Sequence, residues 1–176
     1  MGIGNTTSSS AIVSAITGAD ALVATGRGTG VDDDTLQHKV MVIRKALALH
    51  APDPSDALDV LSKVGGFEIG VLAGVFVGCA ARRIPSVIDG FISGAAALIA
   101  STLEPKAKEF MFASHCSVEK GHIIALTHMG LKPLFNFDMR LGEGTGAVLG
   151  ISIIEAGVKV MNEMATFDGA GVSEKL

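Results

Sequence analysis

The chain has 176 residues, of which 48% are hydrophobic and only 18% are charged, and its mean hydropathy is +0.48. This length suits one domain with a sizeable core, and the net charge of −4 excludes the basic surface that nucleic-acid-binding domains present. The two most apolar windows, residues 69–81 and 90–103, are shorter than the roughly 20 residues of a membrane-spanning helix, so we read both as buried helices and expect no membrane partner.

The spacing of cysteine and histidine gives no metal or disulfide motif. Cys79 and Cys116 stand alone in the sequence, which predicts neither a disulfide nor a zinc site and favours a reducing, cytoplasmic compartment. The histidines lack spacings such as His-Glu-x-x-His, so we expect no metal. The N-terminus has no basic stretch followed by an apolar run, and no signal peptide is expected.

The first half of the chain is predicted to be helical. Its four expected helices cover residues 6–17, 32–50, 54–64 and 67–82. Asn5 or Thr6 can cap the first helix. The acidic residues 32–34 place negative charge at the positive end of the second helix. Between these two helices, the glycines of residues 26–30 predict a loop.

Strands alternate with helices in the second half. Strands are expected over residues 85–89, 109–114 and 134–139, and helices over residues 90–103, 118–129 and 146–164. This repeated order of strand, glycine or serine turn, and helix predicts an α/β fold with parallel strands. Three strands are few for so many apolar helices, so we expect the chain to be part of a larger fold. We assign residues 1–165 to one partial core and residues 166–176 to a polar tail.

The run LGEGTG at residues 141–146 places one carboxylate, Glu143, among three glycines, between an expected strand and a long apolar helix. Glycines let the backbone turn sharply and let a ligand approach closely, and a carboxylate at such a turn can meet a substrate at the edge of a sheet. The run equally suits a plain tight turn before a helix, and the residues alone leave both interpretations open. Asp89 and Asp138, near expected strand ends, are candidate pocket residues that fit capping or pairing better.

Three segments offer backbone N–H groups to an anion. Residues 2–6 and Ser117 lie at expected helix starts, where unpaired N–H groups and the helix dipole attract phosphate, and residues 26–30 can form a nest. Each also suits a simple turn or cap. Lys39 lies at the edge of the apolar face of its helix, where its ammonium either reaches back to water or points inward to an anion; the residues alone favour the first.

Six segments together resemble the nicotinate-nucleotide–dimethylbenzimidazole phosphoribosyltransferase family in their order and spacing. They are GIGNTTS (residues 2–8), GRGTG (26–30), VGGFEI (64–69), PSVIDGF (85–91), SHCSVEKGH (114–122) and LGEGTG (141–146). The resemblance covers essentially the whole chain, and six collinear motifs are far more specific than a single glycine loop.

The resemblance implies a fold and a reaction. The family fold is a three-layer α/β/α arrangement with a Rossmann-like parallel sheet, which we expect to be incomplete here because the N-terminal half is absent, and its members usually form homodimers. They transfer 5-phosphoribose from nicotinate mononucleotide to 5,6-dimethylbenzimidazole, giving α-ribazole 5′-phosphate and nicotinate, in the assembly of the cobalamin lower ligand. The resemblance implies neither a metal nor a redox cofactor.

The matching motifs also imply roles for individual residues. Glu143 is similar to the general base that accepts the benzimidazole N–H proton. The positions that resemble the phosphate site are Gly2, Gly28, Lys39 and Ser117, and those that resemble the base pocket are Met1, Leu141 and Gly142. With an anion to meet, the inward orientation of Lys39 becomes the favoured one.

The chain departs from the family at its start. Family chains are much longer, and a Glu usually precedes the residue that matches Met1; that Glu and the N-terminal half are absent here. Because part of the base pocket comes from that half, we expect this chain to need it for full activity. The alternative is a noncatalytic nucleotide- or phosphate-binding module, or an inactive fragment of the enzyme. The presence of Glu143 favours the enzyme, since phosphate binding alone has no use for a carboxylate there.

Overall fold

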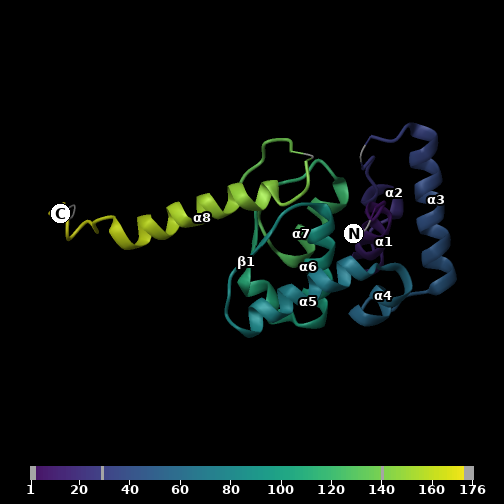
Figure 1. Cartoon of the computed structure of the whole chain (residues 1–176), viewed down its shortest axis with the longest axis horizontal. Helices are drawn as coiled ribbons and strands as arrows, with labels where there is room; N and C mark the ends of the chain where they lie inside the picture. The colour runs from purple at the N-terminus through teal and green to yellow at the C-terminus, as the bar shows by residue number, and fades with distance from the viewer. Residues whose placement is uncertain (1–2, 29, 140, 173–176) are drawn as a thin grey trace.

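The computed structural model describes residues 3–28, 30–139 and 141–172, and Figure 1 shows a helical body from which the last helix extends. The elements in chain order are α1 (Thr6–Thr17), α2 (Ala21–Ala24), α3 (Asp33–His50), α4 (Ala57–Val64), α5 (Phe67–Ala81), β1 (Ser86–Ile88), α6 (Phe91–Leu103), the 3-10 helix η1 (Pro105–Phe110), β2 (Met111–Ala113), α7 (Lys120–Met129) and α8 (Thr145–Glu163). The predicted α/β class is confirmed as a mostly helical chain with a small parallel sheet.

The sheet consists of β1 and β2. The two strands run parallel, in a register that pairs Ser86 with Met111 and Ile88 with Ala113. Parallel neighbours need a crossover connection, and here α6 and η1 provide it. The crossover brings the carboxyl ends of both strands to the same edge, which is where the candidate site lies.

The predicted third strand, residues 134–139, is wrong. Within this segment the described chain forms one isolated parallel bridge, between Phe135 and His115. Pro133, just before it, has no N–H to donate to a ladder, and Asp138 has a left-handed φ of +53° that ends the extended conformation. The alternating apolar pattern is therefore present, but the backbone cannot continue the pairing.

The predicted helices are confirmed, with bounds that shift by a few residues. Side-chain caps explain several of the boundaries: the Asp32 carboxylate accepts the Thr35 N–H at 2.8 Å at the start of α3. Gly18, with a φ of +73°, ends α1. The short α2 was not predicted; Asp20 caps it by accepting the Leu22 N–H, and its four residues are too few to show a helical period.

Helix α6 is the centre of the core. It packs against α1, α5 and α7, and its run of alanines lets these neighbours come close. Leu98 and Ile99 of α6 are fully buried, together with Ile12 of α1 and Ile69 of α5. The prediction that residues 90–103 form a buried helix is confirmed.

Helix α5 is buried on one face only, so the prediction for residues 69–81 is wrong for the other face. Ile69 and Phe76 point into the core, whereas Val71 and Val75 are exposed. The composition of α5 is apolar all round, which is why the sequence could not distinguish the two faces. Among the described residues, no element covers the exposed face.

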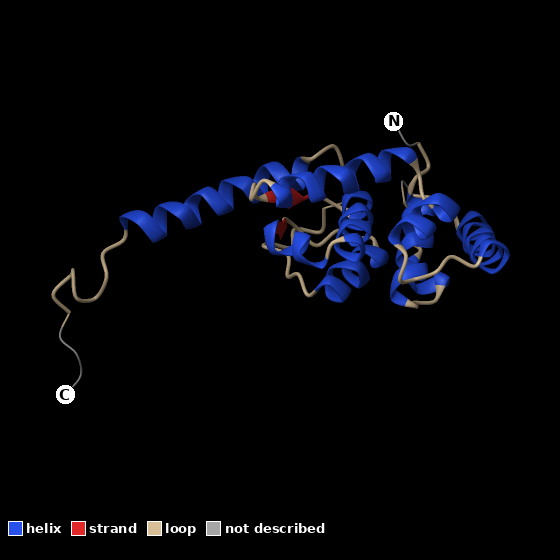
Figure 2. Cartoon of the chain, turned by 90° about the horizontal axis from the view of Figure 1, so that it is seen from below, coloured by secondary structure: helices blue, strands red, loops and turns tan. Residues whose placement is uncertain are grey.

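Helix α8 begins at the site and then leaves the body of the molecule (Figure 2). Its buried residues are Gly146 and Gly150, in its first turns. Among the described residues it is the one helix long and apolar enough to cross a membrane, with 19 residues, a mean hydropathy of 1.2 and 11% of the window buried. A helix that packs against protein can have the same length and composition. The first turns of α8 pack against β1, which ties its start to the body.

A matched pair of leucines tests the position of the core. Leu98→Ala in α6, where the side chain is 0% exposed, should lower the free energy of unfolding by about 2–5 kcal/mol. Leu49→Ala in α3, where the side chain is 71% exposed, should change it by less than about 0.5 kcal/mol. Urea unfolding followed by circular dichroism measures both, and equal losses would contradict the packing described here.

Candidate active site

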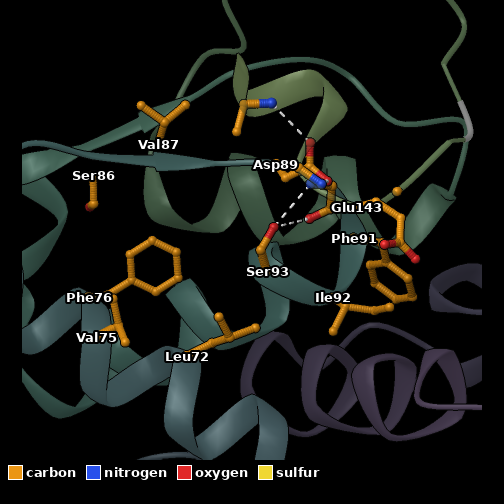
Figure 3. A pocket seen from close by; sticks show the side chains of 14 residues that line it. Leu72, Val75, Phe76, Ser86, Val87, Asp89, Phe91, Ile92, Ser93 and Glu143 are labelled. Atoms are coloured by element: carbon orange, nitrogen blue, oxygen red, sulfur yellow. Dashed lines mark hydrogen bonds between the residues drawn. The ribbon is translucent and has the colours of Figure 1, made fainter. Parts of the chain in front are cut away.

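The site lies at the carboxyl ends of β1 and β2, the edge at which open parallel sheets bind ligands. A cavity of about 500 Å³ is lined by α5, β1, the start of α6 and the turn at residues 142–144 (Figure 3). A smaller cavity of about 190 Å³ lies beside it and is lined by Thr6, Gly28 and Ser117, among others. The two cavities share the wall formed by residues 90–92 and Gly142, so one ligand could extend across both.

Glu143 occupies a strained turn at the larger cavity. Its φ is +66°, in the left-handed region that residues with a side chain rarely adopt, at a cost of roughly 1–2 kcal/mol. Thr145 closes the turn, since its N–H and its hydroxyl donate to the carbonyl oxygen of Gly142 at 3.3 and 2.9 Å. The Glu143 side chain is exposed and lines the cavity together with Phe76 and Leu72 of α5 (Figure 3). Ala51, Arg83 and Asp138 are also left-handed, so it is the position of Glu143 at the cavity, not its φ, that distinguishes this turn from a plain one.

Asp89 holds this turn in place. Its carboxylate accepts the N–H of Gly144 at 3.2 Å and the N–H of Ala147 at 3.0 Å. Asp89 directly follows β1, so it caps the start of α8 from a different segment of the chain and complements the positive end of the helix dipole. The capping interpretation of Asp89 is confirmed, and the cap also fixes the backbone on which Glu143 sits.

Two glycines of α8 allow the close contact with the sheet. A Cβ added at Gly146 would lie 2.1 Å from Cδ2 of His115 and 2.9 Å from Oδ1 of Asp89. A Cβ added at Gly150 would lie 2.8 Å from Cβ of Ser114. Any side chain at these positions would push α8 away from the sheet and move the Glu143 turn with it.

Lys39 points inward. From α3, its Nζ donates to Oγ1 of Thr6 at 2.8 Å and to the carbonyl oxygen of Gly26 at 3.4 Å. Burial lowers the pKa of the Lys39 ammonium, and the nearby carboxylate of Glu119 opposes that shift. A half-buried ammonium with no paired carboxylate among the described residues is well suited to an anionic ligand.

Two of the other predicted phosphate positions, Gly28 and Ser117, line the smaller cavity, and Gly28 lies close to Lys39. Gly28 has a left-handed φ of +57°, and a Cβ there would come within 3.3 Å of Oγ1 of Thr6 and 3.9 Å of Nζ of Lys39. Ser117 is buried at the end of the segment that follows β2, and its Oγ accepts the N–H of Glu119 at 3.3 Å. Gly28 and Ser117 both line the smaller cavity. The remaining predicted position, Gly2, lies outside the described residues.

The predicted base-pocket residues are placed in part. Leu141 and Gly142 line the smaller cavity, and Gly142 also lines the larger one. Met1 lies outside the described residues. The structure therefore places Glu143 at the larger cavity, Leu141 at the smaller cavity with Gly28 and Ser117, and Gly142 at both.

Several residues at the site were not singled out from the sequence. Thr6, Glu119, His115 and His122 all belong to segments that carry the family resemblance, but a motif does not reveal which of its side chains face a cavity. Thr6, His115 and Glu119 line the smaller cavity, and His122 is fully buried behind Ser117. In the described part of the chain, no three side chains of the metal-ligating types form a cluster.

His122 is a neutral structural histidine. Burial, with a smaller contribution from His115, lowers the pKa of His122 to about 4. Its Nδ1 accepts the N–H of Ser117 at 3.3 Å, a bond that requires an unprotonated Nδ1. The backbone of Ser117 thus depends on His122 remaining neutral.

The buried His122 should make stability depend on pH. Because its folded pKa of about 4 lies below the ordinary value of 6.5, the unfolded chain binds the proton first, and stability falls as the pH drops from about 6.5 towards 4. The loss should reach up to about 3 kcal/mol. Urea unfolding from pH 7 to pH 4 measures it in the parent and in His122→Gln, in which the slope should be smaller.

The exposed His38 provides the control for this measurement. His38→Gln should keep the parental slope, because the side chain is exposed on α3. If His122→Gln does not fold, NMR titration of the histidine Cε1 protons in the parent measures the same property. A His122 resonance that titrates near pH 6.5 would contradict the neutral buried state.

Comparison with known proteins places the chain in a family. A family model described as phosphoribosyltransferase matches residues 1–172. The nicotinate-nucleotide–dimethylbenzimidazole phosphoribosyltransferase of Roseiflexus castenholzii is 64% identical over 176 residues, which are 100% of this chain and 50% of that protein. The enzyme of the same name from Chloroflexus aggregans is 63% identical over 99% of this chain and 50% of that protein. The chain therefore spans about half the length of the curated relatives it matches.

Solved structures agree with the sequence comparison. The crystal structure of CobT from Thermus thermophilus superimposes with a TM-score of 0.92 at 40% identity, covering 99% of this chain and 52% of that one. A second structure, of the phosphoribosyltransferase with the full family name from the same organism, gives a TM-score of 0.89 at 38% identity over 99% of this chain and 51% of that one. With a family model that matches nearly its whole length, the chain belongs to the nicotinate-nucleotide–dimethylbenzimidazole phosphoribosyltransferase family.

Proposed function

We propose that this chain, together with the part of its relatives that it does not span, transfers 5-phosphoribose from nicotinate mononucleotide to 5,6-dimethylbenzimidazole. The products are α-ribazole 5′-phosphate and nicotinate, and the reaction belongs to the assembly of the cobalamin lower ligand. The names of the relatives support this assignment. The observation that carries it is the Asp89-supported turn that places Glu143 at a cavity adjoining a second one, whose lining residue Thr6 accepts a hydrogen bond from Lys39.

Glu143 serves as the general base. It accepts the N–H proton of the benzimidazole, the freed nitrogen lone pair attacks C1′ of the ribose, and the electrons of the C1′–N bond leave with nicotinate. The leaving ring nitrogen is cationic in the nucleotide and becomes neutral on departure, so no acid is needed on that side. The chain has only to align two rings and remove one proton, and alignment and general-base catalysis are the two effects that a positioned carboxylate supplies.

The nucleotide phosphate binds around Lys39. Gly28 and Ser117 line the smaller cavity together with Thr6, and the ammonium of Lys39 donates to the hydroxyl of Thr6. The family resemblance adds Gly2, which lies outside the described residues. A bound phosphate would favour the charged form of Lys39 and offset the cost of its burial. This grip fixes the position of C1′ relative to Glu143.

The benzimidazole ring occupies the larger cavity. Leu72, Val75 and Phe76 of α5 form its apolar wall, opposite the turn that carries Glu143 (Figure 3). A methylated bicyclic ring is apolar except at its two nitrogens, which matches a hydrophobic cavity with one carboxylate. Gly142 lines both cavities and Leu141 the smaller one, so both lie where the ring would meet the nucleotide. Met1, the third position that the resemblance assigns to the base pocket, lies outside the described residues.

Assembly and compartment form part of the same proposal. The exposed apolar sides of α5 and α8 are the surfaces on which the remainder of the enzyme and a second subunit pack, giving a cytoplasmic homodimer. Residues 1–165 form the core of this half, and residues 166–176 form a tail.

The alternative is a noncatalytic nucleotide- or phosphate-binding module that uses the same loops. The position of Glu143 at the larger cavity favours the enzyme. A module that only held phosphate would gain nothing from a carboxylate at the neighbouring cavity.

Substitution of the base tests the proposal directly. In the full-length polypeptide, Glu143→Gln should reduce nicotinate release by about 10²- to 10⁴-fold, because the amide cannot accept the benzimidazole proton. Nicotinate mononucleotide should bind with nearly parental affinity, since Glu143 does not touch the phosphate. Turnover equal to that of the parent would refute the assignment of Glu143 as the base.

A separate assay shows whether the other half of the enzyme is required. It compares nicotinate release by the 176-residue chain in the presence and in the absence of that half.

Substitution of Lys39 separates the two cavities. Lys39→Ala should weaken the binding of nicotinate mononucleotide by about tenfold or more, because it removes the buried cation from the phosphate site. The affinity for dimethylbenzimidazole should change much less. Isothermal titration with each ligand measures the difference, and the exposed Lys45→Ala on the same helix is the control. Equal losses for both ligands would instead indicate a general disturbance of the fold.

A further inference from the structure

Glu119 carries a carboxylate that none of the roles above uses. It occupies the N-cap position of α7, but its side chain accepts no hydrogen bond from that helix. The carboxylate is turned instead towards the loop at Gly26, where an added Cβ would lie 1.9 Å from Oε2. Only glycine at position 26 leaves room for the carboxylate in this orientation.

The carboxylate oxygen is buried without a partner. Among the described residues, Oε2 of Glu119 has no hydrogen-bond donor, and it is shielded from water. An unsatisfied buried acceptor is costly, and a charged one is more so. Oε2 itself faces the Gly26 loop, but the Glu119 side chain also lines the smaller cavity, where a ligand that brings its own donors would compensate the carboxylate.

The location restricts what that ligand group can be. Glu119 lines the smaller cavity between the phosphate positions Gly28 and Ser117 and the turn residues Leu141 and Gly142. A phosphate has only acceptors at neutral pH and would be repelled, whereas the sugar that joins the phosphate to the ring carries two adjacent hydroxyls. Carboxylates commonly bind ribose hydroxyls in this way at the edges of parallel sheets.

We infer that Glu119 binds the ribose 2′- and 3′-hydroxyls of the nucleotide and so selects ribonucleotides over deoxynucleotides. This inference rests on the proposed function, which supplies the phosphoribosyl substrate. Glu119 lies near Lys39, so the site carries a cation and an anion side by side. The cation would face the phosphate, and the anion would face the two hydroxyls of the ribose. The bound nucleotide then supplies an anion to the ammonium of Lys39 and hydroxyl donors to the carboxylate of Glu119.

Nucleotide binding, measured without the benzimidazole so that no turnover occurs, tests the inference. In the full-length polypeptide, the parent should bind nicotinate mononucleotide about 10- to 100-fold more tightly than its 2′,3′-dideoxy analogue, the range expected for hydrogen bonds to a charged group. In Glu119→Ala this ratio should fall to near one. Glu109→Ala, an exposed carboxylate in η1, is the matched control and should keep the parental ratio.

The outcomes distinguish this inference from the proposed function. The inference would be overturned if the parent bound nicotinate mononucleotide and its dideoxy analogue equally well. It would also be overturned if Glu119→Ala weakened binding of both nucleotides and kept the parental ratio of affinities. In either case, continued release of nicotinate would leave the proposed function intact. Conversely, a Glu119-dependent ratio without any nicotinate release on addition of dimethylbenzimidazole would leave the inference standing and remove the transferase assignment. If Glu119→Ala does not fold, Glu119→Gln, which loses the charge but keeps its size, should still reduce the ratio.

Discussion

The site depends on one pair of hydrogen bonds, from the backbone N–H groups of Gly144 and Ala147 to the carboxylate of Asp89. They join the end of a short strand to the start of a long helix more than fifty residues later in the chain. The helix start supplies partly positive N–H groups, and the strand end supplies the negative charge that satisfies them. Glu143 directly precedes Gly144 and adopts a left-handed conformation. The backbone next to the Glu143 carboxylate is thus held by a carboxylate from a different segment of the chain.

The two adjoining cavities differ in the side chains that surround them. On one side, Lys39 is turned inward and hydrogen-bonded to Thr6, in a region built from α1, α3 and the segment after β2. On the other side, the apolar face of α5 and the Glu143 turn enclose a larger and more hydrophobic space. The two spaces meet at the shared wall of Gly90 to Ile92, and their difference in character is what the proposed pairing of a nucleotide with an aromatic acceptor requires.

Much of the fold could be predicted from the sequence because it is encoded locally. Caps such as Asp32 and the uninterrupted apolar run of α6 determine helix boundaries and burial over short distances. The third strand could not be predicted, because its failure results from the backbone conformation at Asp138, which no alternating pattern reveals. The glycines around Glu143 predicted a turn at this position. The left-handed backbone of Glu143 and the cap from Asp89 could not be predicted, because they depend on tertiary contacts. The inward turn of Glu119 likewise depends on the space that a glycine leaves on a loop about ninety residues earlier.

Helix α8 is attached to the body at one end only, through the close contacts at Gly146 and Gly150. Its 19 residues extend for about 28 Å at 1.5 Å per residue. A rotation of a few degrees at the anchored turn therefore displaces the distal end by a few ångströms, as with a lever pivoting at its base. A pair of spectroscopic labels, one at that end and one on the body, would amplify and report movements of the Glu143 turn that are too small to observe at the turn itself.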